Sequence, residues 1–229
     1  MGRKLLEQKA RVDKDRLYMP REALELLKSL EGAKFDESIE AHIRLNVDPR
    51  KADQMVRGTL MLPNGTGKTR RVAAFVVGEK AREAEEAGAD IVGSDDLAAR
   101  IRDDGFMEFD VAVATPDQMS IVGRLGPILG PRGLMPNPKS GTVTPNVGRA
   151  VEDIKRGKIE YRVDRYGIIH AIIGKKSFDI DKLVENYFAL RDELQRIRPA
   201  AVRGRYFKSV ALATTMGPAI QVDPTVEKD

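Results

Sequence analysis

Five consecutive residues, Gly65-Thr66-Gly67-Lys68-Thr69, resemble the end of a phosphate-binding loop. The full pattern is Gly, four residues, Gly, Lys, and then Ser or Thr, so its first glycine would stand at position 62, where the chain has Leu62. The pattern also needs a helix after the lysine, because the N–H groups and dipole of that helix bind the phosphate. Residues 70–77 have the apolar character of a strand. We therefore expect a hinge loop here and no nucleotide site.

A second glycine-rich run extends from Gly123 to Gly133. Its spacing differs from Gly-x-Gly-x-x-Gly, and a proline-rich loop follows it in place of a helix, so a structural loop is favoured over a dinucleotide site. Binding of an anion by Arg132 and Lys139 stays open, because N–H groups exposed beside glycines can gather phosphate. The alternative is a nucleotide-dependent enzyme, with its site in this run or at residues 67–69.

Side chains for other chemistries are scarce. The chain has no cysteine, which excludes disulfides, thiol nucleophiles and zinc–thiolate sites. Its two histidines, His42 and His170, are far apart in sequence, and paired acids such as Glu85-Glu86 lie in charged runs typical of solvated surfaces. A hydrogen-bonded sheet histidine is favoured for His170 over a general base, and a bond to a sugar or phosphate stays open. We expect no enzyme, no cofactor and no metal.

The charges are unevenly spread over the 229 residues, whose formal net charge is +4. Residues 1–66 carry 13 basic and 11 acidic residues, residues 67–157 carry 13 and 14, and residues 158–229 carry 13 and 10. If the two ends fold together, they form a body of charge +5 with a near-neutral insert. No apolar run approaches the roughly 18 residues of a membrane helix, and no signal segment opens the chain, so we expect a cytoplasmic protein.

The two ends predict one α+β domain. Pro20 begins a helix that Gly32 ends, and residues 38–45 alternate between apolar and polar side chains as a half-buried strand does. This alternation places Ser38, Glu40 and His42 on the outward face of the strand. Further strands are expected at 55–62, at 158–163 with 167–174 as its antiparallel partner, and at 207–215 as the last strand; a second helix is expected at 181–197.

The middle segment predicts a Rossmann-like module, because short apolar strands alternate with helices there. Strands are expected at 71–77, 90–92 and 109–114, and helices at 80–87, at 95–102 and from Pro116. Residues 116–145 hold six of the 12 prolines, so we expect a long structured loop in that region. The fold class predicted is α/β with two domains: a discontinuous α+β domain, with an antiparallel sheet and two helices, and an inserted parallel α/β domain.

Two short stretches of the outer domain contain groups that suit RNA. Residues 33–38 place a cation beside an aromatic ring at an exposed turn, and residues 214–218 end a strand with two hydroxyls, a methionine and a glycine. RNA-binding sites use hydroxyls for the 2′-OH, flat or flexible apolar groups for bases, and cations for phosphates. A turn and an ordinary strand end fit the same residues equally well.

Six stretches occur in the order found in the family of the bacterial large-subunit ribosomal protein number one, the protein of the mobile ribosomal stalk, and the chain resembles that family over nearly its whole length. The stretches are Ala33-Lys34-Phe35, Asp53-Gln54-Met55-Val56-Arg57-Gly58, Leu62-Pro63-Asn64-Gly65-Thr66-Gly67, Leu129-Gly130-Pro131-Arg132-Gly133-Leu134-Met135-Pro136-Asn137-Pro138-Lys139, Gly167-Ile168-Ile169-His170 and Thr214-Thr215-Met216-Gly217. The fourth stretch is highly specific to the family.

The resemblance implies an RNA-binding domain I of residues 1–66 plus 158–229, a Rossmann-like domain II of residues 67–157, and a hinge near 65–69 and 156–159. It implies a structural constituent of the large ribosomal subunit that binds the stalk region of large-subunit ribosomal RNA and supports release of exit-site tRNA. It also implies repression of the protein's own mRNA through a mimic of the rRNA site. The protein would be a monomer outside the ribosome, with no membrane partner.

Carried over position by position, the RNA-contacting surface of the family falls on twelve residues from both ends of the chain. They are Lys34, Phe35, Ser38, Glu40, Arg165, His170, Lys175, Ser177, Ser209, Thr215, Met216 and Gly217. The chain departs from the usual pattern at three positions. Met55 and Val163 stand where the family has Asn, and Asn64 stands where His is common.

Overall fold

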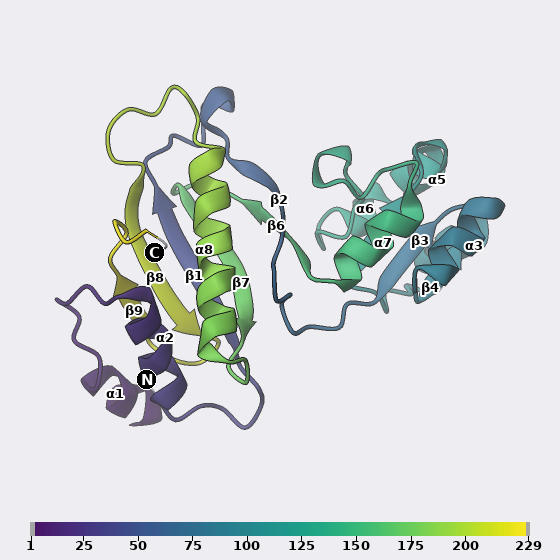
Figure 1. Cartoon of the computed structure of the whole chain (residues 1–229). Coiled ribbons are helices and arrows are strands. Elements are labelled where there is room, and N and C mark those ends of the chain that lie inside the picture. The colour runs from purple at the N-terminus through teal and green to yellow at the C-terminus, as the bar shows by residue number, and fades with distance from the viewer. Residues whose placement is uncertain (1–2, 228–229) are drawn as a thin grey trace. The chain divides into compact units, whose positions relative to one another are not determined.

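The computed structural model describes residues 3–227 and divides the chain into two compact units. Unit 1 comprises Met1–Gly67 with Ile159–Asp229, and unit 2 comprises Lys68–Lys158 (Figure 1). Unit 1 has one main hydrophobic core, and unit 2 has two smaller ones. No helix within residues 3–227 is long and apolar enough to cross a membrane.

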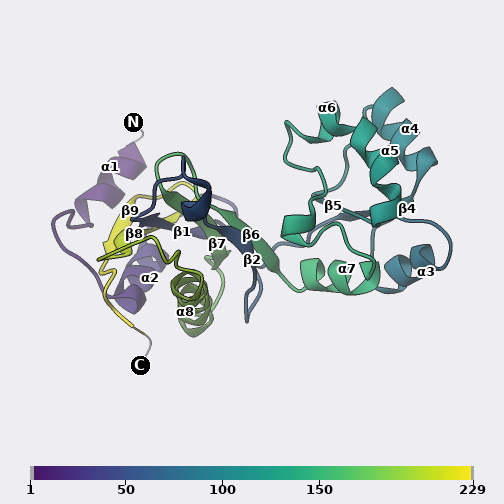
Figure 2. The ribbon, with the colours of Figure 1, turned by 90° about the horizontal axis from the view of Figure 1, so that it is seen from above.

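The main sheet of unit 1 has the strand order β7-β1-β8-β9, and neighbouring strands run antiparallel. The strands are β1 (Ser38–Leu45), β7 (Ile168–Lys175), β8 (Phe207–Thr214) and β9 (Ala219–Val222). The helices α2 (Pro20–Ser29) and α8 (Ile180–Arg196) lie side by side on one face of this sheet (Figure 2). This arrangement confirms the predicted α+β class, with an antiparallel sheet and two covering helices.

Alternation along β1 decides which side chains enter the core. Ile39, Ala41 and Ile43 are fully buried, and they pack with the apolar stripes of α2 and α8. Because successive side chains of a strand point to opposite faces, Glu40 and His42 lie on the other face of the sheet. On α8, Leu183, Tyr187, Leu190 and Leu194 are spaced three or four residues apart, so they lie on one face of the helix, and that face is buried.

The remaining elements of unit 1 are small. Strand β2 (Arg57–Met61) pairs with β6 (Lys158–Arg162) in a two-stranded sheet, and a 3₁₀ turn, η1 (Ala52–Gln54), precedes β2. Helix α1 (Arg3–Ala10), near the N-terminus, was not predicted.

Three predictions for unit 1 were wrong. Residues 168–175 pair with β1 over seven residue pairs and meet the 158–163 region at a single bridge, Val163–Ile169, because the apolar face of β7 must lie over the main core. Gly32 does not end helix α2, because the helix already ends at Ser29 and the backbone of Leu30 is extended. Gly32 instead lies against the carboxylate of Glu37. Strand β8 is not the last strand, because β9 follows it and completes the sheet edge.

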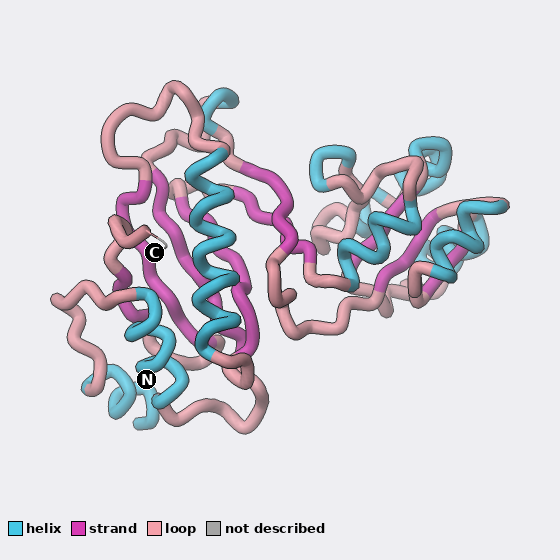
Figure 3. Tube along the Cα trace, viewed as in Figure 1, coloured by secondary structure: helices cyan, strands magenta, loops and turns pink. Residues whose placement is uncertain are grey.

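Unit 2 has a parallel sheet of order β4-β3-β5, made of β3 (Val72–Phe75), β4 (Ile91–Gly93) and β5 (Val111–Ala114). Strands and helices alternate along this unit (Figure 3). One core contains Ala73 and Phe75 of β3, and the other contains Val72 and Ala74, so both faces of the sheet are covered. The predicted Rossmann-like class is confirmed.

The helices of unit 2 distribute between these two cores. The core that contains Ala73 and Phe75 includes residues of α4 (Asp95–Asp103), α5 (Met119–Arg124) and α6 (Gly126–Leu129). The core that contains Val72 and Ala74 includes residues of α3 (Glu79–Glu86) and α7 (Val147–Lys155). Two 3₁₀ turns, η2 (Pro116–Gln118) and η3 (Pro138–Ser140), interrupt the proline-rich segment. Helix α7, which follows that segment, was not predicted.

The two glycine-rich runs fold without a nucleotide motif. After Lys68 the chain forms no helix before β3 begins at Val72, so the N–H cluster of a phosphate-binding loop does not form. The run from Gly123 to Gly133 spans the end of α5, the short helix α6 and a turn.

Candidate nucleic-acid interface

The start of β1 and the end of β8 meet at one edge of the main sheet, although 177 residues separate them. The backbone N–H of Ser38 donates to Oγ1 of Thr215 at 3.0 Å, and the N–H of Thr215 donates to the carbonyl of Ser38 at 3.1 Å. Lys175, on β7, is the register partner of Ser38 on its other side. The structure therefore brings together Ser38, Thr215 and Lys175 from three separate stretches.

Ser38 itself differs from expectation, because it is only 5% exposed. The alternation had placed it on the outward face with Glu40 and His42. The register between β1 and β7 shifts between Ile39 and Glu40, and the segment after β8 bonds back onto Ser38. Ser38 therefore contributes to this edge mainly by fixing Thr215.

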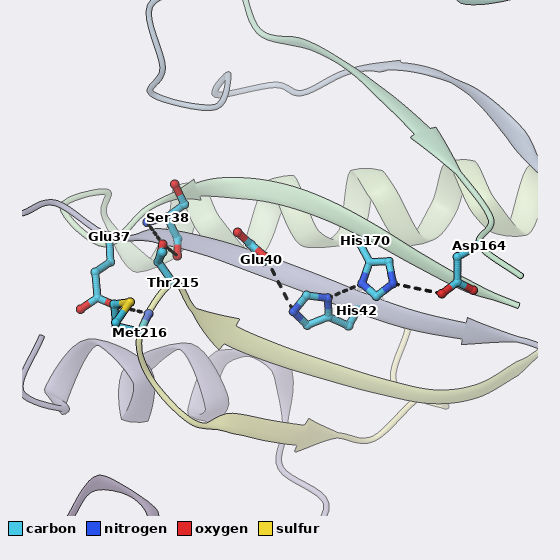
Figure 4. A network of polar contacts seen from close by, with 8 residues as sticks. All are labelled: Glu37, Ser38, Glu40, His42, Asp164, His170, Thr215 and Met216. Carbon is cyan, nitrogen blue, oxygen red and sulfur yellow. Dashed lines mark hydrogen bonds and ion pairs between the residues drawn. The ribbon is translucent and has the colours of Figure 1, made fainter. Parts of the chain in front are cut away.

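Glu37 is the residue that the sequence analysis missed. It is 1% exposed, and its carboxylate accepts the N–H of Ala33 at 2.6 Å. The same carboxylate accepts the N–H of Met216 at 3.0 Å (Figure 4). Burial alone would raise the pKa of Glu37, but the N–H groups of Met216 and Ala33, the Thr214 hydroxyl and Lys176 outweigh it and lower that pKa. The buried carboxylate thus joins the turn before β1 to the turn after β8.

Two glycines make room for this junction. A Cβ at Gly32 would lie 2.7 Å from Oε1 of Glu37, and a Cβ at Gly217 would lie 2.3 Å from Oγ1 of Thr214. Both distances are shorter than real Cβ contacts, so any larger residue at either position would displace the turn. Gly217 is therefore required by the packing of the 214–217 turn.

A second clamp holds the 33–37 turn to the end of β7. The carboxylate of Asp36 accepts the N–H of Ser177 at 3.1 Å and its hydroxyl at 2.8 Å. The ammonium of Lys175 donates to the backbone carbonyl of Asp36 at 3.0 Å. With its base fixed in this way, the turn presents Lys34 and Phe35 to solvent, and Phe35 is 56% exposed.

Exposed apolar groups lie on both sides of the Glu37 junction. Met216 is 62% exposed although its N–H is fixed by a buried carboxylate, and Phe35 lies on the turn that the same carboxylate holds. Large apolar side chains held rigidly in solvent are typical of recognition surfaces. We call the set Lys34, Phe35, Ser38, Lys175, Ser177, Thr215, Met216 and Gly217 the edge cluster.

Glu40, His42, His170 and Asp164 form a polar chain along the face of the sheet opposite α2 and α8 (Figure 4). Nδ1 of His42 lies 2.8 Å from Nδ1 of His170, whose Nε2 lies 3.5 Å from Asp164, while Nε2 of His42 lies 3.9 Å from Glu40. At that spacing one Nδ1 donates and the other accepts, so the pair shares one hydrogen.

Burial and the neighbouring His170 lower the pKa of His42 below its ordinary value of 6.5, and Glu40 opposes this shift. No group of three or more His, Cys, Asp or Glu that could hold a metal ion occurs among the described residues. The two histidines are therefore a hydrogen-bonded sheet pair, with His170 on the more exposed side.

Four predicted site residues lie outside the edge cluster, and two of these lie at the other end of the sheet. Ser209 on β8 faces Arg44, six residues along β1 from Ser38, which is about 20 Å in an extended strand. Arg165 lies in the turn between β6 and β7, next to the same end of the sheet. Glu40 and His170 lie between the two ends. The structure thus gathers eight of the twelve predicted residues in one cluster, while Glu40, His170 and Ser209 lie on the sheet away from it and Arg165 lies in the β6–β7 turn.

The fold and this surface define a class of protein: a discontinuous α+β unit with a polar edge and a parallel α/β unit inserted into it. Residues 27–218 match the model of the ribosomal protein L1p/L10e family, and the chain belongs to that family. The chain is accordingly a ribosomal structural protein and not an enzyme.

Curated relatives agree with this assignment. The chain is 80% identical over 228 residues to the large ribosomal subunit protein uL1 of Rubrobacter xylanophilus, covering 100% of this chain and 99% of the relative. It is 60% identical to the large ribosomal subunit protein uL1 of Thermobifida fusca, covering 99% and 95%, and 60% identical to that of Mycolicibacterium vanbaalenii, covering 96% and 93%.

Proposed function

We propose that this chain, a structural constituent of the large ribosomal subunit in the cytoplasm, binds the stalk region of large-subunit ribosomal RNA through unit 1. The observation that carries the proposal is the edge cluster, in which a buried carboxylate holds two exposed apolar side chains beside hydroxyls and cations. A rigid surface loses little conformational entropy on binding, so more of its contact energy becomes affinity.

Each part of the edge cluster has a role in this proposal. Phe35 and Met216 pack on sugars or bases, because RNA recognition uses flat or adaptable apolar groups against unpaired nucleotides. The Thr215 hydroxyl accepts the N–H of Ser38 and donates to the Ser38 carbonyl over a long 3.4 Å, so the hydroxyl can turn to donate to a ribose oxygen instead. Lys34 and Lys175 contact phosphates at this edge, Arg165 contacts a phosphate outside the edge cluster, and these three cations set the salt dependence of binding.

We further propose that the same surface binds a mimic of the rRNA site on the protein's own mRNA and so represses its translation. In this account domain I (1–66 plus 158–229) holds the RNA, while domain II (67–157) moves about a hinge near 65–69 and 156–159 and supports release of exit-site tRNA. The support for these roles is the family resemblance, and the protein acts as a monomer outside the ribosome.

Truncation of the edge cluster tests the proposal. We expect Thr215→Ala and Met216→Ala each to weaken binding of stalk RNA by more than about 1–2 kcal/mol in a gel shift, because Thr215→Ala leaves polar groups of the interface without a partner and Met216→Ala removes an apolar contact with the RNA. Met61→Ala is a matched control, since Met61 is an exposed methionine of β2 outside the cluster. Unchanged affinity in a folded Thr215→Ala or Met216→Ala variant would contradict the assignment.

A further inference from the structure

A hollow of about 370 Å³ opens on unit 1 at the far end of the main sheet from the edge cluster. The loop between β1 and β2 and the turn between β6 and β7 form its walls, so it lies wholly within one unit. Its lining includes three guanidinium groups, one aromatic ring and two aliphatic side chains, from Arg50, Arg162, Arg165, Tyr166, Met55 and Val163.

The charge of the lining is positive. Among the described residues that line the hollow, Asp164 is the one carboxylate, and its Oδ1 already accepts the N–H groups of Tyr166 and Ile168, both at 2.8 Å. Burial opposes ionisation of Asp164, but these two N–H groups and then His170 outweigh it and lower its pKa. Three arginines against one engaged carboxylate favour an anion such as a phosphate.

The apolar part of the lining favours a flat ring beside that anion. Tyr166 is 65% exposed, and the guanidinium of Arg165 lies over its ring at 5.0 Å from the centroid. Val163 is buried and Met55 is partly buried, and these are two of the positions where the chain departs from its family resemblance by replacing Asn. An aliphatic floor next to an exposed aromatic ring is suited to stacking of a base.

The turn that carries Tyr166 is rigid. The N–H of Gly167 donates to the carbonyl of Asp164 at 3.1 Å, and the N–H of Asp164 donates to the carbonyl of Ile168 at 2.8 Å. Gly167 has φ +80, and a Cβ there would lie 3.2 Å from the carbonyl oxygen of Leu45. The backbone beneath Tyr166 is therefore fixed, which reduces the entropy lost when a ligand packs on its ring.

We propose that this hollow binds one unpaired nucleotide of the RNA that unit 1 holds. The base stacks on Tyr166 above Met55 and Val163, and the phosphate is held by Arg50 and Arg162. A paired base is excluded, because stacking on a protein ring needs an exposed base face. The proposal rests on the proposed function and adds to it a second contact, distinct from the edge cluster.

An abasic scan of the stalk RNA tests the base contact. Binding of the full-length chain is measured to RNAs that each lack one base, with wild type, Tyr166→Ala and Tyr166→Phe. For one unpaired nucleotide we expect loss of the base to weaken wild-type binding about 5- to 150-fold, the range measured for stacking on an aromatic side chain. Tyr166→Ala should show a similar loss on intact RNA and no further loss on that abasic RNA, and Tyr166→Phe should behave as wild type.

The phosphate contact has its own measurement. Arg50→Ala and Arg162→Ala should each lower the slope of log K against log salt by about one, as expected when one phosphate contact is removed. Arg21→Ala is the matched control, because Arg21 is exposed on the helix-covered side of unit 1, where it pairs with Asp181. Its slope should equal that of wild type.

The outcomes separate this proposal from the proposed function. If Thr215→Ala weakens binding but Tyr166→Ala does not, or if the abasic penalty persists in Tyr166→Ala, the nucleotide pocket is wrong and the edge cluster stands. A lower salt slope in the arginine variants without an effect of Tyr166→Ala means that phosphate alone is held, and this also overturns the proposal. If wild type does not bind stalk RNA, both proposals fall.

Discussion

Glu37 is a single carboxylate on which two turns of unit 1 depend. It accepts N–H groups from both turns. A hydrogen bond to a charged group contributes about 1.5–3 kcal/mol to the free energy of unfolding. We expect Glu37→Gln to lower the free energy of unfolding by about 1–3 kcal/mol in urea titrations, and to weaken RNA binding because Met216 loses its anchor. Glu25→Gln is the control, because Glu25 is an exposed carboxylate of α2, outside the predicted RNA-contacting surface. Equal unfolding midpoints for wild type and Glu37→Gln would contradict this role.

The alternation of β1 contains the signal that could have identified Glu37. Extended one residue back, it places Glu37 with Ile39 and Ala41 on the buried face, where a carboxylate must find donors. These donors could not be identified from the sequence. A turn brings the N–H of Ala33 to Glu37, and the pairing of β1 with β8 brings the N–H of Met216 to it across 179 residues. The same limit explains why Ser38 was predicted to be outward.

At His42, the lowered pKa predicts a pH dependence of stability. The unfolded chain holds a proton on His42 at a higher pH than the folded chain does, so this residue stabilises the fold above about pH 6.5 and the contribution is lost as the pH falls through its folded pKa. We expect His42→Gln to lose less unfolding free energy than wild type between pH 7 and pH 5. Glu40→Gln should lose more, because Glu40 raises the pKa of His42. Identical pH profiles for all three proteins would disprove the shift.

Among the elements, those with a strong period were predictable. The alternation of β1 and the helical stripe of α8 come from side chains within one segment, and the structure places both within one residue of the predicted bounds. The partner of β7, the end of α2 and the existence of β9 depend on contacts between distant segments. For that reason the sheet order could not be derived from local pattern.

The turn between β6 and β7 offers a matched pair of substitutions. Gly167 and Gly204 both have left-handed φ, at +80 and +73, but only a Cβ at Gly167 would meet backbone, at 3.2 Å from the Leu45 carbonyl oxygen. Each Gly→Ala change costs about 1–2 kcal/mol for the left-handed conformation. We expect Gly167→Ala to lower the thermal midpoint more than Gly204→Ala. An equal or smaller decrease would mean that the turn adjusts freely.

For the whole molecule, the two units have separate cores. The apolar cluster of unit 1 contains no residue of 68–158, and the two clusters of unit 2 contain none of unit 1. A unit with its own core can in principle fold alone. Charge follows the same partition, since the basic excess belongs to the two ends of the chain and the inserted segment is near neutral.

The most direct test of the account is a gel shift with stalk RNA and a chain in which a short glycine–serine linker replaces residues 68–158. Circular dichroism and thermal unfolding first establish that unit 1 is folded. We predict that the shortened chain binds with an affinity within a few-fold of the full chain, with the same salt dependence, and that Met216→Ala weakens both. A folded unit 1 that no longer binds the RNA would show that unit 2 carries the binding, and would contradict the central claim.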